Sequence, residues 1–238
     1  MNEARRGDRA GLLVMPPSRA HSGSGGCRIS VRCFGNHLYT MYTPAHFAET
    51  DRARIEAVIR DNAFGTLVSV VDGRAQASHI PFLYDSERGV LQGHVARANP
   101  QWETLDSAQD VLVIFQGPHA YISPTWYTRP GVPTWNYVTV HVHGRATTFE
   151  EPGRLRALVE ALSSRYEAPG DAAWSGEYNP RMLGMIVGFE IAIDDIQAKF
   201  KLSQNRSVED RRAVVDALRS TGDPERERLA ALMEQNQG

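Results

Sequence analysis

The decapeptide Gly93-His94-Val95-Ala96-Arg97-Ala98-Asn99-Pro100-Gln101-Trp102 is the stretch that decides how this chain is interpreted. An apolar, alternating segment with Val90 and Leu91 leads into it. Asn99-Pro100 is typical of a helix start, with Asn as the N-cap and Pro at the first helical position. The stretch therefore predicts a strand, a short turn and a helix that begins at Asn99.

The predicted helix start is also a candidate anion site. The first N–H groups of a helix are unpaired and carry partial positive charge, and His94 and Arg97 add donors and charge just before them. A phosphate group is the ligand that this pattern favours. The alternative is an ordinary Asn-Pro cap beside one exposed arginine, and the decapeptide alone leaves both interpretations open.

Length and composition favour a globular protein. The chain has 238 residues, of which 42% are hydrophobic, so we expect one core, or one core with an appendage. No apolar run approaches the roughly 18 to 20 residues that span a bilayer, and the Arg-rich start lacks the apolar stretch of a secretory signal. We expect a cytoplasmic protein with no membrane partner.

Charge is unevenly distributed between the first 40 residues and the rest. Residues 1–40 carry six arginines against Glu3 and Asp8, a net charge of +4, which leaves −6 for residues 41–238 because the whole chain carries −2. The acidic body argues against strong non-specific binding to nucleic acid phosphates. Residues 1–40 are rich in Arg, Gly and Ser, and we expect a disordered tail or a mis-assigned upstream start, with Met41 as the alternative beginning.

Cysteine and histidine spacing predicts no metal site. Cys27 and Cys33 are the only cysteines, which excludes a disulfide framework, and with His37 they lack a fourth ligand at a recognisable spacing. His141 and His143 share one face of a predicted strand, but no third ligand matches their spacing. Exposed or pocket-lining histidines are the favoured interpretation of this pair.

Periodicity predicts a mainly β chain with flanking helices. A hairpin is expected around Asp72-Gly73, and short strands separated by turn signals favour antiparallel pairing. The expected strands are 64–71, 74–84, 90–95, 111–116, 138–144 and 185–193, and the expected helices cover about 50–61 and 151–166.

An aromatic stretch, 121–137, contains Trp126, Tyr127, Trp135 and Tyr137 among several prolines. Proline disfavours a central strand or a long helix, so we expect an ordered loop. Such a loop would form the wall of a pocket for a planar ligand or a subunit contact. A plain loop that covers the core is the other interpretation.

The C-terminal segment predicts two amphipathic helices, Val208–Leu218 and Glu225–Met233, separated by Thr221-Gly222-Asp223-Pro224. A helix-turn-helix DNA reader and a helical hairpin both fit this pattern. Residues 206–238 hold six arginines against seven acids, so no basic recognition face is present. We therefore expect a helical hairpin that closes the domain or its dimer.

Motifs distributed over residues 41–236 resemble the PaiB family, which is described as FMN-binding negative transcriptional regulators. The motifs are Met41-Tyr42-x-Pro44-x-His46-Phe47, Ser78-His79-Ile80-Pro81-Phe82, the decapeptide 93–102, Phe115-Gln116-Gly117-Pro118-His119-Ala120-Tyr121-Ile122-Ser123-Pro124-x-Trp126-Tyr127, Val132-Pro133-Thr134-Trp135-Asn136-Tyr137, Val140-His141-Val142-x-Gly144 and Lys199-Phe200-Lys201-Leu202-Ser203-Gln204-Asn205. Only the first 40 residues lie outside the resemblance.

The resemblance implies an α+β fold of the mainly β kind, a six-stranded antiparallel FMN-binding split β-barrel that dimerises with flavin at the interface. It implies a split-barrel domain over 41–205 and a helical hairpin over 206–238 that packs on the domain or the dimer. Ser78, His79 and Ile80 would flank the flavin ring, and His94, Arg97 and Asn99 would meet its phosphate. Further implied cofactor contacts are Trp102, Trp135, Lys199 and Lys201.

The resemblance implies an FMN-binding repressor that acts as a homodimer, although the acidic body makes direct DNA binding doubtful. An alternative is a flavin- or haem-dependent enzyme, either an oxidoreductase or an N–N bond-forming enzyme. His79, His94 and His119 lie near predicted strand ends, and a neutral imidazole can be a haem axial ligand. A third alternative is an interaction module without a cofactor, whose aromatic loop only buries a dimer interface.

Overall fold

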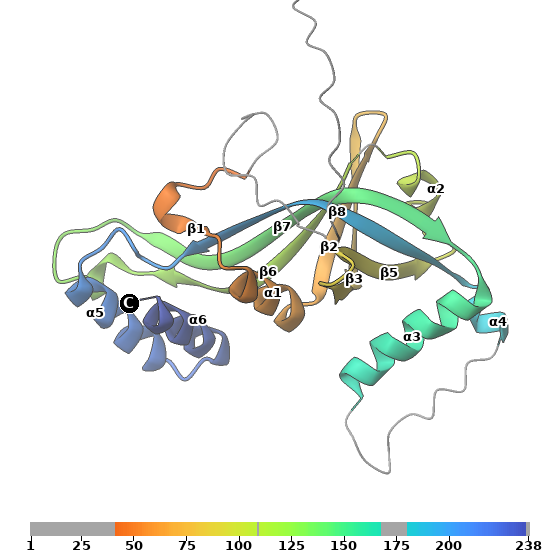
Figure 1. Ribbon diagram of the computed structural model, residues 1–238. Coiled ribbons are helices and arrows are strands. Elements are labelled where there is room, and N and C mark those ends of the chain that lie inside the picture. Colours follow the sequence, from red (N-terminus) through yellow and green to blue (C-terminus); the bar gives the residue numbers. More distant parts are fainter. Residues whose placement is uncertain (1–40, 109, 168–179, 237–238) are drawn as a thin grey trace, which may run out of the picture.

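The computed structural model describes residues 41–108, 110–167 and 180–236, which form a mostly antiparallel sheet flanked by helices (Figure 1). The strands are β1 (Ala48–Glu49), β2 (Phe64–Val71), β3 (Arg74–Pro81), β4 (Leu83–Asp85), β5 (Val90–Ala96), β6 (Val111–Ile122), β7 (Thr134–Phe149) and β8 (Ile186–Lys201). The helices are α1 (Arg52–Asp61), α2 (Trp102–Leu105), α3 (Pro152–Tyr166), α4 (Pro180–Leu183), α5 (Val208–Arg219) and α6 (Pro224–Gln235), with 3-10 turns η1 (Ala45–Phe47) and η2 (Pro124–Trp126). The predicted tail and its cysteines lie outside the described residues.

The strands form one sheet in the order β3-β2-β6-β7-β8-β5-β4, with β1 paired to β8. All of these pairings are antiparallel, so the predicted fold class is confirmed. The strand number differs from the predicted six, because the described sheet has eight strands. Two of them are very short: β1 has two residues and β4 has three.

The β2–β3 hairpin forms where the sequence predicts it. Asp72 and Gly73 have φ values of 50° and 74°, and positive φ at both central residues is the geometry of a type I′ turn, which matches the twist of the flanking strands. The second predicted run, 74–84, is nevertheless two strands. Phe82 is buried in the core and its N–H donates to the carbonyl of Ala63, which turns the chain between β3 and β4.

The central strands are much longer than predicted. β6 continues to Ile122, β7 spans Thr134–Phe149 and β8 continues to Lys201, so the predicted aromatic loop shrinks to residues 123–133. Proline does not end β6, because Pro118 lies at a register shift between Gln116 and His119, where the ladder needs no N–H from it.

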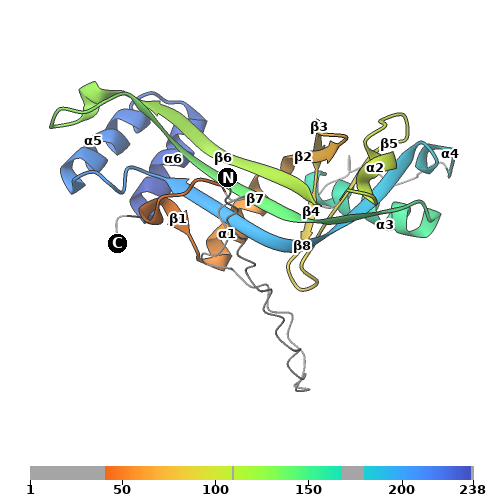
Figure 2. The same ribbon diagram turned by 90° about the horizontal axis from the view of Figure 1, so that it is seen from above.

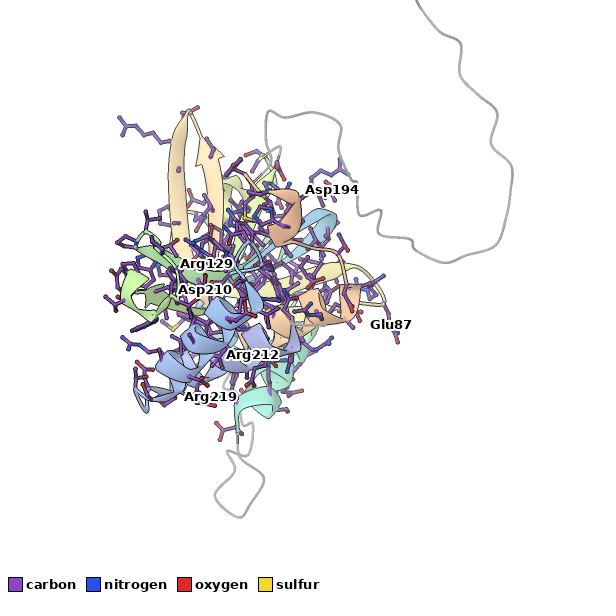
Figure 3. The ribbon with its side chains drawn as sticks, turned by 90° about the vertical axis from the view of Figure 1, so that its left-hand side faces the viewer. Glu87, Arg129, Asp194, Asp210, Arg212 and Arg219 are labelled. Atoms are coloured by element: carbon purple, nitrogen blue, oxygen red, sulfur yellow. The ribbon has the colours of Figure 1, made fainter. Side chains whose placement is uncertain are left out.

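Three of the helices begin at residues whose side chains cap the backbone. The Asp51 carboxylate accepts from the backbone N–H groups of Ala53 and Arg54 and starts α1, whereas Ser207 and Asp223 start α5 and α6. Asp210 on α5 also fixes the loop before β7, because the N–H and hydroxyl of Thr128 both donate to its Oδ1 at 2.7 Å. Figure 3 views this end of the molecule, where Asp210 lies near Arg129.

The main core lies between the inner face of the sheet and helices α1, α5 and α6. Val138, Val140 and Val142 of β7 are fully buried there with Ile59, and Leu229 of α6 closes the same cluster. A second cluster packs α3 and α4 around Phe149 at the far end of β7. In Figure 1 the four longer helices lie on one side of β6, β7 and β8. None of the described helices is long and apolar enough to cross a membrane.

Candidate functional site

The turn after β5 differs from its prediction. α2 has only four residues and begins at Trp102, with Gln101 at the N-cap, so the predicted helix start at Asn99-Pro100 is wrong. Asn99 instead caps a local turn, in which its Oδ1 accepts from the N–H of Gln101 at 3.0 Å. A helix of one turn offers little dipole to an anion, so anion binding here depends on side chains.

Arg97 is held by the chain that precedes β8. Its Nε donates to the carbonyl of Gly184 and its Nη2 reaches Glu150 Oε2, both at 2.7 Å. Its guanidinium lies 5.8 Å from the ring centroid of Trp102, whose Nε1 donates back to the Arg97 carbonyl. The arginine therefore already has an anionic partner, in a partly exposed ion pair of the kind that contributes little net stability.

A buried amide network joins the turn to the β2–β3 hairpin. Asn99 Nδ2 donates to Ser78 Oγ at 2.8 Å, so two residues assigned to opposite sides of the predicted site are in direct contact. Gln101 is only 2% exposed, and its Nε2 lies 3.0 Å from Ser69 Oγ and within 3.4 Å of two strand carbonyls. Sequence reasoning missed Gln101 and Ser69. Ser69 is a polar residue inside an apolar run, which is a signal, whereas Gln101 follows Asn99-Pro100 and gives none.

Ser78, His79 and Ile80 do not share one face. Ser78 and Ile80 lie opposite Leu67 and Gly65 and point toward the core side, because side chains alternate along a strand. His79 points to the other face, where its Nδ1 lies 3.2 Å from Thr66 Oγ1. A planar ligand on one face of β3 would therefore contact either Ser78 and Ile80 or His79, but not all three residues.

His94 has a buried, unpartnered nitrogen. Its Nδ1 makes no hydrogen bond to any described residue, and burial lowers the pKa of the imidazole. His94 follows Gly93, which lies over the ring of Phe189 so closely that an added Cβ would come within 2.8 Å of it. The neutral imidazole keeps an unused lone pair or N–H for a ligand.

The remaining predicted site residues lie at the opposite end of the sheet. Lys201 Nζ donates to Thr134 Oγ1 and to the carbonyl of Trp135, and Lys199 Nζ donates to the carbonyl of Tyr42. Along β8, Lys201 lies thirteen residues beyond Gly188, the partner of His94, which is on the order of 40 Å of extended strand. Within one copy of the chain, the predicted site residues therefore form two groups at opposite ends of β8.

We call these two groups the rim cluster and the distal cluster. The rim cluster consists of Ser78, Ile80, His94, Arg97, Asn99, Gln101 and Trp102, and the distal cluster consists of Trp135, Lys199, Lys201 and Arg206. β8 connects them, beginning next to Arg97 and ending at Lys201 (Figure 2).

A hollow of about 320 Å³ adjoins the distal cluster. It is lined by Gln116, His119, Trp135, Tyr137, Val138 and Thr139. The Trp135 side chain is 53% exposed and its ring contacts those of His119 and Tyr121. The predicted aromatic pocket wall thus lies on strands rather than on a loop. The sequence predicts His119 only as a haem ligand and does not predict Gln116 as a site residue. Both residues nevertheless alternate with buried residues along β6.

The sheet face opposite the main core, which we call the outer face, is largely uncovered by the described helices. Phe64 and Val70 of β2 are 68% and 57% exposed on it. His141 and His143 of β7 lie on the same face, where His143 Nδ1 contacts Asp110 at 3.0 Å. Burial and then His143 lower the pKa of His141. The histidine pair therefore lines a surface, as the alternation of β7 predicts.

Comparisons with known proteins were made for the whole chain. The profile of a family described as "Putative FMN-binding domain" matches residues 41–195. "Protease synthase and sporulation protein PAI 2" of Bacillus subtilis is 40% identical over 202 residues, which cover 82% of this chain and 97% of that protein.

Solved structures with a similar fold include a flavocytochrome and an FAD and heme binding protein. The flavocytochrome Anf3 from Azotobacter vinelandii has a TM-score of 0.56 and 13% identity, covering 69% of this chain and 74% of that one. The FAD and heme binding protein from Mycobacterium smegmatis also has a TM-score of 0.56, with 18% identity, covering 70% and 78%. At these identities the likeness concerns the fold.

Proposed function

Since this chain belongs to the PaiB family of FMN-binding proteins, we propose that it binds FMN as a homodimer and acts as a negative regulator of transcription. The dimer proposal rests on the exposed apolar residues of the outer face. Exposed Phe64 and Val70, with the half-buried Val68, Leu112 and Ile114 beside them, form an apolar surface that a monomer would leave in water. A second copy that covers this face removes the apolar area from solvent.

The rim cluster offers groups that fit a flavin phosphate and its polar chain. His94 supplies an unpartnered nitrogen, Asn99 and Ser78 supply an amide and a hydroxyl, and Arg97 supplies a guanidinium. A phosphate would compete with Glu150 for Arg97, and the competition is favourable because the existing ion pair is partly exposed. When bound, flavin supplies electron- and hydride-transfer chemistry.

Regulation is proposed to act through a ligand-dependent change at the dimer surface. The name of the Bacillus subtilis relative refers to protease synthesis and sporulation, which supports a regulatory role. Several arginines of the C-terminal helices are paired with carboxylates: Arg219 contacts Glu227 and Glu234, and Arg228 contacts Glu225. Direct operator binding therefore has the least support within the proposal.

Two measurements test this function. Purified protein should show flavin absorption bands near about 375 and 450 nm and elute as a dimer. A gel-shift titration with the segment that begins at Met41, at several salt concentrations, then tests operator binding. A colourless protein that gains no thermal stability from added FMN would refute the cofactor, because ligand at 100 times its Kd should add about 2.7 kcal/mol.

An enzyme that uses haem or flavin is the second candidate. His94 favours it, since a buried neutral imidazole with a free nitrogen suits a haem axial ligand better than the exposed His79 and His119. This candidate predicts a Soret band near about 410 nm in the purified protein. His94→Ala should abolish the band while His119→Ala leaves it, and the opposite pattern would exclude His94.

A further inference from the structure

Three cations of the distal cluster form no ion pair with any of the described residues. Lys199 Nζ bonds to a backbone carbonyl, Lys201 Nζ bonds to a hydroxyl and a carbonyl, and the Arg206 guanidinium lies 4.4 Å from the ring centroid of Tyr127. No carboxylate of the described residues lies within 4 Å of any of the three, although most other arginines of the sheet and helices are paired. Arg206 interacts electrostatically with the Asp210 carboxylate, whereas the positive charge of the two lysines is uncompensated by the described residues.

For Lys199, the lack of a carboxylate partner is energetically costly because the residue is buried. The residue is only 8% exposed, and its ammonium lies 5.4 and 5.5 Å from the ring centroids of Tyr42 and Tyr137. A buried ammonium normally needs a counter-ion, because carbonyl and ring contacts replace only part of its hydration. The acids on adjoining strands are engaged elsewhere: Glu49 contacts Arg54 at 2.6 Å, and Asp195 accepts from Gln197 at 2.7 Å.

The uncompensated charge borders the hollow on the outer face. Strand pairing places Lys201 beside Tyr137 and Lys199 beside Thr139, and both partners line the hollow. The half-exposed ring of Trp135 forms another wall, and the Lys201 ammonium bonds to its carbonyl. The volume, about 320 Å³, suits a single small molecule with one aromatic ring.

We propose that this hollow binds a planar organic anion. Its ring would lie against Trp135 and Tyr137, and its carboxylate or phosphate would face Lys201 and Lys199. Burial, followed by repulsion from Lys199 and Arg206, lowers the pKa of Lys201, and the charge of a bound anion would offset the repulsion and favour the charged ammonium. Within one copy the two clusters lie at opposite ends of β8, so flavin held by the rim cluster of that copy does not occupy the hollow.

The test uses 4-fluorobenzoate as the probe and its neutral isostere 4-fluorobenzamide as the control, each titrated with the purified full chain and followed by ¹⁹F NMR line broadening. We expect the anion to bind and the amide not to bind measurably. Lys201→Met should weaken anion binding by about tenfold or more, whereas Lys201→Arg should retain most of it. 4-Fluorophenyl phosphate, as a second probe, distinguishes a carboxylate ligand from a phosphate ligand.

Arg156→Met is the charge-matched control, since it also removes one positive charge but lies on α3, which packs at the Phe149 end of β7, away from the lining residues 135–139. It should leave anion binding unchanged, and thermal melts should show that Lys201→Met folds. Equal binding of the benzamide, or unaltered anion binding by Lys201→Met, would overturn the proposal. FMN titration of the same variants separates the two sites: if 4-fluorobenzoate displaces FMN and Lys201→Met weakens both, the cluster holds the flavin phosphate and the proposed second ligand is wrong.

Discussion

The rim cluster and the distal cluster contain similar polar side chains, but most polar groups of the rim are paired within the protein and the two distal lysines have no carboxylate partner among the described residues. At the rim, Arg97 is paired with Glu150, and Asn99 and Gln101 are bonded to the β2–β3 hairpin. At the distal end, Lys199 and Lys201 are bonded to neutral oxygens only. Internal pairing gives a region its shape, whereas uncompensated charge gives it affinity for an ion, so residue type alone does not distinguish a structural site from a binding site.

Removing the buried amide of the rim should have the largest effect. Gln101→Ala removes the buried amide that donates to Ser69 Oγ and to the carbonyls of Leu67 and Gln76, and the free energy of unfolding should fall by about 2 to 4 kcal/mol. Urea denaturation measures this change.

Gln76→Ala is the matched control, because the Gln76 side chain is exposed and only its backbone joins the network. It should change stability by less than about 0.5 kcal/mol. If both variants lose the same stability, the network does not explain the effect, and the contrast between the two clusters loses its basis.

Arg97→Ala tests whether the paired rim also binds. If a flavin phosphate takes the guanidinium from Glu150, the variant loses a charge-assisted contact worth about 1.5 to 3 kcal/mol, and FMN affinity should fall about 10- to 150-fold. Arg97→Lys should restore affinity only in part, since an ammonium cannot reproduce the planar fork. Isothermal titration with FMN gives the values.

Glu150→Gln complements this experiment by freeing Arg97 without removing it. We expect FMN affinity to stay equal or to rise. FMN binding by Arg97→Ala at wild-type strength would instead make Arg97 a structural clamp between β5 and the chain before β8.

Asn99→Ala should have a moderate effect on stability. It removes the bond to Ser78 and the turn cap on the Gln101 N–H, at a cost of about 1 to 2 kcal/mol. Ser78→Ala removes only the first bond and should cost less. In a double-mutant cycle the two changes should not be additive, because they share that bond; additive values would show that the contact contributes nothing.

The smallest expected effect is a pH dependence of stability that comes from His94. Burial lowers its folded-state pKa, so below the unfolded pKa of about 6.5 the unfolded chain binds the proton more readily. Stability contributed by the neutral ring is therefore complete above that pH and is lost as pH falls toward the folded pKa. The slope cannot exceed about 1.4 kcal/mol per pH unit for one proton.

The measurement compares denaturation of wild type and His94→Asn between pH 7.5 and pH 5.5. Both proteins keep His141, whose pKa burial also lowers, so the difference between them isolates His94. Equal loss of stability in both proteins would show that the His94 ring gains a proton as easily when folded as when unfolded.

Features set by neighbouring residues were predictable from the sequence. The Asp72-Gly73 turn and the start of the helix expected at about 50–61 depend on a few adjacent residues, and they lie close to where the sequence predicts them. The lengths of β6 and β8 were not predictable in the same way. Pro118 is tolerated because of a register shift against β7, which is a property of the pair of strands and not of either one.

The candidate site was harder to predict because its contacts are distant in sequence. Arg97 and Glu150 are 53 positions apart, and Lys199 and Tyr42 are 157 apart, so no local spacing reveals either pair. Alternation placed His141 and His143 on one face correctly. The same rule, applied to Ser78, His79 and Ile80, shows that they cannot all face one ligand surface, and the resemblance to a family obscured this point.

The two borders of the sheet show how its growth is limited. Along the described order of strands, β3 and β4 form the free edges. β3 ends in Pro81, which has no N–H to offer to another strand, and β4 is only three residues long. Neither edge is a good template for an added strand, so edge-to-edge addition of further copies is disfavoured. The proposed dimer uses the broad outer face instead, where the pairing of two copies would close the assembly.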